Sequence, residues 1–308
     1  MVRAFSRLHL GLFELGGHFG RRFGGTGVYI QRPGLTVAIE NSPQKTVVGD
    51  HVQLAIEATE AVETYFGRKF TGRMTVSSEI PVHRGFGSVT QLKLAVATAV
   101  LATWNIVVEP ARLAPIVGRG RVSNIGTLLF EHGGFVVELP KKDPTNNQPC
   151  FIRFEFPEEW TFVITYPKDV SGPDDETEKK MFENLLPMSV SRCAELSHVL
   201  LSRLLPALWE KDVKDFGESL TAFQRIVGEH FSSLQGGVFR SQEAIDLFED
   251  LNAAGVGQSS WGPAVYALFG DERTATDASE KASEQLGDGW VVFTAKAVNH
   301  GAVVSISP

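Results

Sequence analysis

The feature that most constrains this fold is the apolar stretch at residues 88–104, SVTQLKLAVATAVLATW, which follows the glycine-bearing loop PVHRGFG. A helix that is apolar nearly all round is buried, so the stretch predicts an internal helix with other elements packed around it. The N-terminus of this helix then points out of the core from the loop. Its unpaired N–H groups and its dipole favour an anion at that point.

The loop itself has the residue types of a phosphate-binding site. Gly85 and Gly87 allow the backbone to approach a ligand closely, and the hydroxyls of Ser88 and Thr90 can contact a phosphate or a metal. The loop matches neither G-x-x-x-x-G-K-[ST] nor G-x-G-x-x-G, and a plain turn is the alternative. The candidate phosphate-binding residues are His83, Gly85, Gly87, Ser88, Thr90 and Gln91.

The composition is that of an ordinary globular protein. The 308 residues are 43% apolar and 21% charged, which suits one large domain or two medium ones. No apolar run approaches the ~20 residues that span a bilayer. The first residues lack a clean apolar core, so we expect no signal peptide. Cys150 and Cys193 are too few for a disulfide framework, and we expect a cytoplasmic protein.

The charge distribution favours a small anionic ligand over a nucleic acid. The net charge is −7, whereas nucleic-acid-binding domains usually carry a basic surplus. Basic residues lie beside glycines in the first half, at Arg21-Arg22, His83-Arg84 and Arg119-Gly120-Arg121. Such side chains suit a small anion, and solvated loop charge is the alternative for any one of them. We expect small-molecule partners, with no nucleic acid and no membrane.

Hydrophobic periodicity predicts a mixture of strands and helices in two parts, residues 1–150 and 151–308. The first part has expected strands at 28–30, 35–39, 73–76 and 135–139, and helices at 51–66 and 88–104. Residues 141–150, KKDPTNNQPC, predict a hairpin or a linker. The second part has expected strands at 151–156, 160–166, 290–297 and 301–307, and helices over about 176–232 and at 242–254.

Three further segments have the residue types of a ligand site. In GVGQSSWGP, residues 255–263, the serines can cap a helix that starts at Trp261, and the indole can stack on a ring; a plain helix–loop–helix turn is the alternative. In residues 118–135 an arginine-bearing loop leads into a short helix, where Glu131 either meets a cation or is a surface charge. The strand RLHLGLF places Arg7 and His9 on one face, which favours a role for both in a site.

The combination of these motifs resembles a known superfamily. The loop P-x-x-x-G-F-G-S is similar to the second signature of the GHMP small-molecule kinases, and GVGQSSWGP occupies the place of their third. Within that superfamily, RLHLGLFEL, RFGGTGVYI, HRGFGSVTQLKLAVA, GRGRVSNIG, FEHGGF, QGGVF and GVGQSSWGP together resemble the beta-ribofuranosylaminobenzene 5′-phosphate synthases. The resemblance covers nearly the whole chain.

The resemblance implies an α+β fold of two domains, the GHMP-kinase-like fold. It joins an N-terminal ribosomal-protein-S5-like domain, which carries the glycine-rich phosphate loop, to a C-terminal ferredoxin-like α/β sandwich. The implied enzyme is a glycosyltransferase (a pentosyltransferase) that condenses phosphoribosyl pyrophosphate with 4-aminobenzoate or 4-hydroxybenzoate. Pyrophosphate and CO₂ leave, on the way to tetrahydromethanopterin. The implied cofactor is Mg²⁺, ATP is not consumed, and members of the superfamily often form homodimers.

The resemblance also assigns roles to residues. The 83–90 loop and Mg²⁺ would bind the pyrophosphate, with added charge from Arg84, Arg119, Arg121 or Arg22. The aromatic acid would lie near Arg7, His9 and the 255–262 segment, with Trp261 against its ring. The implied catalytic residues are Arg7, His9, Arg84, Arg121 and Glu131. The implied substrate-binding residues are Gly25, Thr26, Gly257, Gln258, Ser259, Ser260 and Trp261. The implied metal ligands are Ser88, Thr90 and Glu131.

Two alternatives to the synthase remain open at this point. One is an ATP-dependent kinase of the same superfamily, and the other is a non-catalytic paralogue that binds a nucleotide or a phosphosugar. Superfamily kinases commonly carry an aspartate base in Ser-Gly-x-Asp, and the matching residue here is Gly126, which cannot deprotonate an alcohol. The chain also departs from the synthases at Asn124 and at Val89. We expect the Val89 side chain to crowd the phosphate loop.

Overall fold

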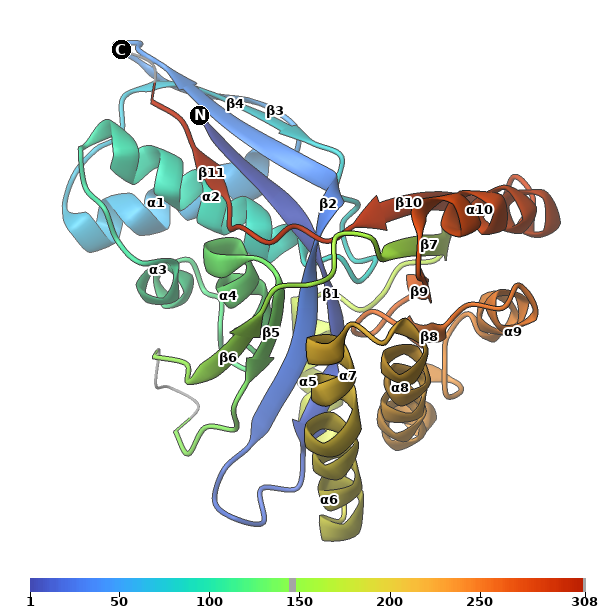
Figure 1. Cartoon of the computed structure of the whole chain (residues 1–308). Helices are drawn as coiled ribbons and strands as arrows, with labels where there is room; N and C mark the ends of the chain where they lie inside the picture. The colour runs from blue at the N-terminus through green and yellow to red at the C-terminus, as the bar shows by residue number, and fades with distance from the viewer. Residues whose placement is uncertain (144–147, 307–308) are drawn as a thin grey trace.

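The computed structural model describes residues 1–143 and 148–306, and within them the strands form one seven-stranded and one four-stranded sheet (Figure 1). The larger sheet has the order β11-β1-β2-β4-β3, with β5 paired to β2 and β6 paired to β5. Its pairs are antiparallel, apart from the parallel pair β3 and β4. The strands are β1 (Val2–Glu14), β2 (Phe23–Glu40), β3 (Lys45–Gly49), β4 (Gly72–Ser78), β5 (Phe135–Glu138), β6 (Phe151–Phe154) and β11 (Val303–Val304).

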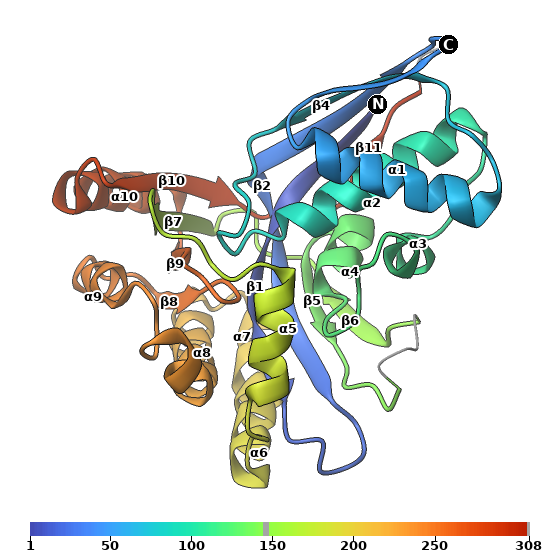
Figure 2. The ribbon, with the colours of Figure 1, turned by 180° about the vertical axis from the view of Figure 1, so that it is seen from behind.

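Helix α2 is the centre of the first layer of helices. It contacts β1 and β2 on one side and α1, α3 and α4 on the others, as Figure 2 shows from behind. Leu94, Val96 and Val100 are fully buried, which confirms the predicted internal helix. The helices of this layer are α1 (Val52–Phe66), α2 (Ser88–Thr103), α3 (Pro110–Ile116) and α4 (Ile125–His132).

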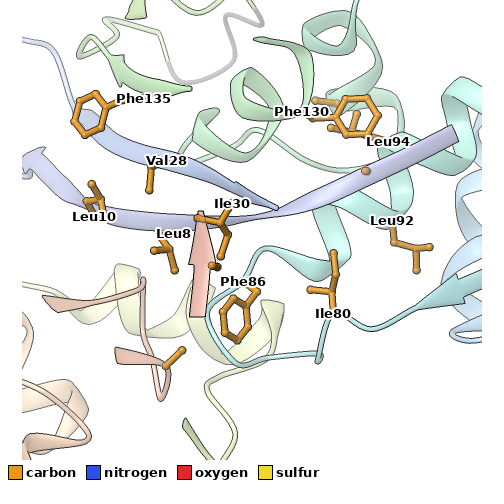
Figure 3. Packing of buried hydrophobic residues seen from close by; sticks show 14 of the residues in the cluster. Leu8, Leu10, Val28, Ile30, Ile80, Phe86, Leu92, Leu94, Phe130 and Phe135 are labelled. Atoms are coloured by element: carbon orange, nitrogen blue, oxygen red, sulfur yellow. The ribbon is translucent and has the colours of Figure 1, made fainter. Parts of the chain in front are cut away.

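The loop before α2 is anchored in the core by one aromatic side chain. Phe86 is fully buried and lies below Leu8 of β1 and Ile30 of β2 in Figure 3. It packs edge-on against Tyr166, with ring centroids 5.7 Å apart. Because Tyr166 belongs to the smaller sheet, this ring fixes the loop where the two sheets meet.

The smaller sheet has the order β10-β7-β9-β8 and is antiparallel throughout. Helices α9 and α10 pack on its strands, while α8 contacts both β8 and β1 and so joins the two sheets. Asp212 caps the start of α8, and Gly236 ends it with a φ of 86°. The strands are β7 (Thr161–Pro167), β8 (Gly255–Gln258), β9 (Val265–Phe269) and β10 (Trp290–Lys296). The helices are α5 (Asp175–Asn184), α6 (Val190–Val199), the π-helix η1 (Leu200–Leu204), α7 (Leu205–Glu210), α8 (Val213–Gln235), α9 (Gln242–Asp250) and α10 (Glu272–Leu286).

The structure corrects two expectations about the elements. The expected strands at 28–30 and 35–39 are parts of one strand, β2, which pairs with β5 through its first half and with β4 through its second. The expected helix start at Trp261 is wrong. Residues 255–258 form β8, whose backbone pairs with β9, so residues 259–264 are the turn of a hairpin. Strands β3, β8 and β9 and helices α3 and α10 were not predicted.

The sheet pairing also does not follow the expected boundary between residues 150 and 151. Strand β6 pairs with β5, and β11 returns to pair with β1, so both belong to the larger sheet. Residues 141–150 connect β5 and β6, whose antiparallel pairing is that of a hairpin. Residues 144–147 of this connection and residue 307 of the last expected strand lie outside the described residues. Across the described ranges, no helix has the length and apolar character needed to cross a membrane.

Candidate functional site

A cleft of about 640 Å³ lies where the two sheets meet. Its lining comes from β1, the start of β2, residues 118–126, α5, α8 and the turn after β8. Helix α5, seen in front of β1 in Figure 2, contributes charged and aromatic side chains to one wall. Among the described residues the lining contains four arginines, and we name the part around Arg7 and Arg119 the basic end. It also contains five aromatic side chains, and we name the part around Trp261 the aromatic end.

Arg7 and Arg119 form the basic end of the cleft, at the N-terminus of α2. Arg7 Nη1 donates to the Gly85 carbonyl at 2.5 Å, and Arg119 Nε donates to Thr90 Oγ1 at 3.0 Å. Gly87 precedes α2 in the left-handed region, with a φ of 74°, and a Cβ there would lie 3.0 Å from Arg7 Nε. No side chain among the described residues caps α2, so the N–H groups of its first turn have no side-chain acceptor. The N-cap residue Gly87 packs against Arg7.

One donor of Arg7 lacks an acceptor. Its Nε is buried and has no hydrogen-bond partner in residues 1–143 and 148–306. Burial lowers the pKa of Arg7 to about 10; Glu178 opposes this shift and Arg119 adds to it. The guanidinium is therefore charged at neutral pH. A buried donor without an acceptor costs about 1–3 kcal/mol.

Arg22 and Arg121 add two exposed cations to the lining. Within the described part of the chain, neither side chain forms a hydrogen bond or an ion pair. They are therefore available to a ligand without the loss of an existing contact. Arg7, Arg22, Arg119 and Arg121 together give the cleft four arginines, although the net charge of the chain is −7.

His9 is a neutral part of the cleft wall. Burial lowers its pKa to about 3, and the charge of Arg7 adds to the effect. Its Nδ1 accepts from the Gly11 N–H at 3.2 Å, which places the ring proton on Nε2. That nitrogen lies 3.2 Å from Ser123 Oγ and donates to it. Both ring nitrogens are thus engaged within the protein, so the imidazole orients its neighbours rather than carrying charge.

The aromatic end of the cleft is built around Trp261. Its ring lies edge-on to Phe182 of α5 and Phe231 of α8, with centroid distances of 5.5 and 4.8 Å. Its Nε1 donates to Glu178 at 3.1 Å. Ser259 fixes the turn that carries Trp261, because its hydroxyl donates to the Gly85 carbonyl at 2.6 Å and accepts from the His9 N–H at 3.0 Å.

The cleft brings together nine of the residues expected from the sequence. They are Arg7, His9, Arg22, Thr90, Arg119, Arg121, Gln258, Ser260 and Trp261. The acidic side chains Asp175 and Glu178 of α5 were not expected. They lie at the start of α5, where the sequence predicts a helix from about residue 176 and where the Asp174 side chain caps the helix.

Most of the expected phosphate loop lies outside the cleft lining. The Arg84 guanidinium donates to the carbonyls of Pro167 and Lys168, at 2.7 and 2.5 Å, and so ties the loop to β7 instead of facing a ligand. Gln91 donates to the Gly126 carbonyl at 2.8 Å and is fully buried. His83, Gly85, Gly87, Ser88, Gln91 and Val89 do not line the cleft among the described residues, and Thr90 alone of the expected loop residues does.

The remaining expected residues support the walls from behind. Gly25 and Thr26 are buried in β2, Gly257 packs against Tyr266, and Ser259 lies beneath the turn. Glu131 is turned away from the cleft: it lies five residues beyond Gly126, about 140° around the α4 axis. Gly126 faces Thr90, so Glu131 faces α3 instead.

The expected metal ligands do not form a site. Ser88 is buried, the Thr90 hydroxyl accepts from Arg119, and Glu131 lies on another face of α4. No group of three or more histidine, cysteine, aspartate or glutamate side chains within the described residues could hold a metal ion.

Comparison with known proteins identifies the class first. The family model described as "GHMP kinases N terminal domain" matches residues 53–127, and the model described as "GHMP kinases C terminal" matches residues 204–288. The mevalonate kinase of Methanococcus jannaschii is 14% identical with a TM-score of 0.71, covering 97% of this chain and 98% of that one. The homoserine kinase of Cytophaga hutchinsonii is 16% identical with a TM-score of 0.69, covering 98% and 96%. The chain has the GHMP-kinase fold, as predicted.

More similar relatives identify the family within that class. The beta-ribofuranosylphenol 5′-phosphate synthase of Methanothermobacter thermautotrophicus is 34% identical, over 96% of this chain and 95% of the relative. The protein of the same name from Archaeoglobus fulgidus is 30% identical, over 99% of each. The chain belongs to the beta-ribofuranosylphenol 5′-phosphate synthase family, a family of enzymes, which confirms the resemblance found in the sequence.

Proposed function

We propose that the chain is a decarboxylating pentosyltransferase that condenses phosphoribosyl pyrophosphate with 4-hydroxybenzoate or 4-aminobenzoate. Its family membership supports the reaction, and the name of the relatives favours the phenol as product. One observation carries the proposal: Arg7 and three further arginines line the same cleft as the aromatic side chain of Trp261. The reaction needs both an anion site and a ring site.

In this proposal the basic end holds the pyrophosphate. Arg7, Arg22, Arg119 and Arg121 line the same cleft, so several charged donors can act on one anion. As the C1′–O bond breaks, its electron pair goes to the pyrophosphate, and donors already in place stabilise that charge. A charge-assisted contact of this kind contributes about 1.5–3 kcal/mol.

The benzoate then lies along the aromatic wall, with its ring against Trp261. The ring carbon that bears the carboxylate attacks C1′, and a carbon–carbon bond forms as the C1′–O bond breaks. The bond to the carboxylate then breaks, its electrons restore the aromatic ring, and CO₂ leaves. No side-chain nucleophile is needed. The enclosed aromatic surface keeps water from the oxocarbenium-like ribosyl carbon.

The kinase alternative has weaker support from the site. Gly126 occupies the position of the kinase aspartate, and a Cβ there would already lie 3.2 Å from Thr90 Cγ2. Mg²⁺ stays in the proposal as the counter-ion that pyrophosphate oxygens bring with them, and we assign it no step. We also propose that the enzyme works in the cytoplasm.

A turnover assay tests the proposal. The chain is incubated with phosphoribosyl pyrophosphate, Mg²⁺ and either carboxyl-labelled benzoate, and pyrophosphate and labelled CO₂ are measured. Equal release of both, dependent on both substrates, is the expected result. ADP formation from ATP with a panel of alcohols would support the kinase instead. Binding without any turnover would support the non-catalytic paralogue.

A further inference from the structure

Glu138 is a buried carboxylate that no part of the reaction above uses. It ends β5, is 1% exposed and does not line the cleft. Yet both of its oxygens accept hydrogen bonds from the segment that carries Arg119 and Arg121. Burial of a carboxylate is costly unless its oxygens are paired, so this arrangement needs a physical reason.

The contacts of Glu138 fix the end of the arginine segment. Its Oε2 accepts from the Asn124 backbone N–H at 2.7 Å and from Ser123 Oγ at 3.3 Å. Its Oε1 accepts from Asn124 Nδ2 at 2.6 Å. Asn124 is the N-cap residue of α4, yet its side chain makes no capping bond to the helix. The amide is thus directed to Glu138 instead.

Lys141 extends this attachment to the middle of the segment. Its Nζ lies 3.7 Å from Glu138 Oε1 and donates to the Gly120 carbonyl at 3.3 Å. Gly120 lies between Arg119 and Arg121 and has a φ of 84°, so its backbone turns there. A Cβ on Gly120 would lie 2.6 Å from Asn124 Oδ1, which shows how closely the turn packs on this amide.

Ser123 connects the same carboxylate to His9. Its hydroxyl donates to Glu138 and therefore presents its lone pairs to His9 Nε2–H and to the Ile125 N–H, at 3.2 Å each. The directions of these bonds agree with the His9 tautomer set by Gly11. One buried carboxylate thus orients two features of the cleft, the arginine turn and the imidazole.

We propose that Glu138 is a positioning residue of the site: through Asn124, Ser123 and Lys141 it holds the Arg119–Arg121 turn and His9 in the geometry that binds the pyrophosphate end of the substrate. The proposal rests on the proposed function for the identity of that anion. It acts through other residues, since Glu138 itself does not reach the cleft.

The variant Glu138→Gln tests this, with inorganic pyrophosphate as the probe. The amide keeps the size of the side chain but turns an –NH₂ group toward donors, so the turn loses an acceptor. We expect pyrophosphate binding by calorimetry to weaken about tenfold. The KM for phosphoribosyl pyrophosphate should rise by a similar factor while kcat changes less. Amide hydrogen exchange of residues 118–124 should accelerate, since their attachment is lost.

Glu63→Gln is the matched control, because it makes the same chemical change in another buried glutamate, which accepts from the Phe70 N–H and does not line the cleft. It should leave pyrophosphate affinity and the exchange of residues 118–124 unchanged. The double variant Glu138→Gln with Arg121→Gln should lose less pyrophosphate affinity than the product of the two single fold-losses. The reason is that an arginine already displaced by Glu138→Gln contributes little to binding. If Glu138→Gln does not fold, Lys141→Met removes the Gly120 attachment together with the ion pair to Glu138, and about a threefold loss is expected.

Pyrophosphate affinity equal to that of the unaltered chain in Glu138→Gln, or full additivity with Arg121→Gln, would overturn the positioning role. So would a failure of the unaltered chain to bind pyrophosphate. A chain that binds pyrophosphate but forms no product refutes only the proposed reaction, and the affinity comparison still decides the role of Glu138.

Discussion

The Asp175 carboxylate accepts a hydrogen bond from Arg119 Nη1 at 2.5 Å, so an acid of α5 is paired with a cation at the basic end of the cleft. The pair is partly open to solvent, with 22% of the Arg119 side chain and 58% of the Asp175 side chain exposed. An anionic substrate that uses Arg119 must therefore compete with this carboxylate. Helix α5 is held at this wall by Phe182, which packs edge-on against Trp261, and by Glu178, which accepts from the Trp261 indole.

The first prediction follows from that competition. Asp175→Asn should lower the KM for phosphoribosyl pyrophosphate by up to about fivefold, because an exposed ion pair contributes about 0–1 kcal/mol. Steady-state kinetics at fixed benzoate measures it. Glu176→Gln is the matched control, since Glu176 pairs with Lys180 on the exposed side of the same helix and does not line the cleft. A higher KM in Asp175→Asn would mean that Asp175 assists binding.

A second prediction concerns Arg7. Arg7→Gln removes the charge at the start of α2 and should reduce kcat/KM for phosphoribosyl pyrophosphate by about 10- to 100-fold, the effect of one charge-assisted contact. The KM for the benzoate should change little, because Trp261 forms that end of the cleft. Thermal unfolding of the variant separates this from a general loss of fold, since Arg7 also binds the Gly85 carbonyl. An unchanged kcat/KM in Arg7→Gln would show that the anion site does not lie at Arg7 and the start of α2.

His9 supports a third prediction, about stability and pH. Its pKa is lowered to about 3 in the folded chain by burial and by Arg7, below the ordinary value of 6.5. Between these values the unfolded chain binds more protons, so this contribution to stability is present above pH 6.5 and is lost as pH falls toward 3. Denaturant unfolding of the chain and of His9→Gln at several pH values measures it.

The pH dependence of the free energy of unfolding should be shallower in His9→Gln than in the unaltered chain between pH 6.5 and 4.5. The same pKa predicts that the pH profile of kcat between about 5 and 8, where an ordinary histidine would titrate, contains no ionisation of His9. Parallel stability curves for the two proteins would show that His9 is accessible to protons in the folded chain.

The elements that could be predicted from the sequence were those with local signals. Residues 88–104 carry the pattern of a buried helix in their own composition, and the ranges predicted and observed for α2 differ by one residue. The turn after β8 shows the opposite case. Its serines have the residue type of helix caps, but the structure uses Ser259 to join His9 to Gly85, 250 and 174 residues away in the chain.

The candidate site shows the same difference between residues that a local motif marks and residues whose partners are distant in the chain. Arg7, His9 and Trp261 were found because motifs mark them. Glu138 was not, since a single glutamate at the end of a short strand has no local sign that its partners are Asn124 and Lys141. The contacts of Arg84 could not be predicted for a related reason. Its position in the loop suggested a phosphate contact, whereas its guanidinium donates to the carbonyl of Pro167 in β7, which is 83 residues further along the chain.

The last prediction separates the ring site from the anion site through Trp261. Trp261→Leu should raise the KM for the benzoate by up to about tenfold, because an aromatic pair contributes about 0.5–1.5 kcal/mol beyond its buried area. Trp261→Phe keeps a ring between Phe182 and Phe231 and loses only the indole donor to Glu178. It should therefore stay within about threefold of the unaltered KM. In both variants the KM for phosphoribosyl pyrophosphate should be nearly constant, since the four arginines are untouched. If the leucine variant raised that KM and left the benzoate KM unchanged, the two ends of the cleft would have been assigned to the wrong substrates.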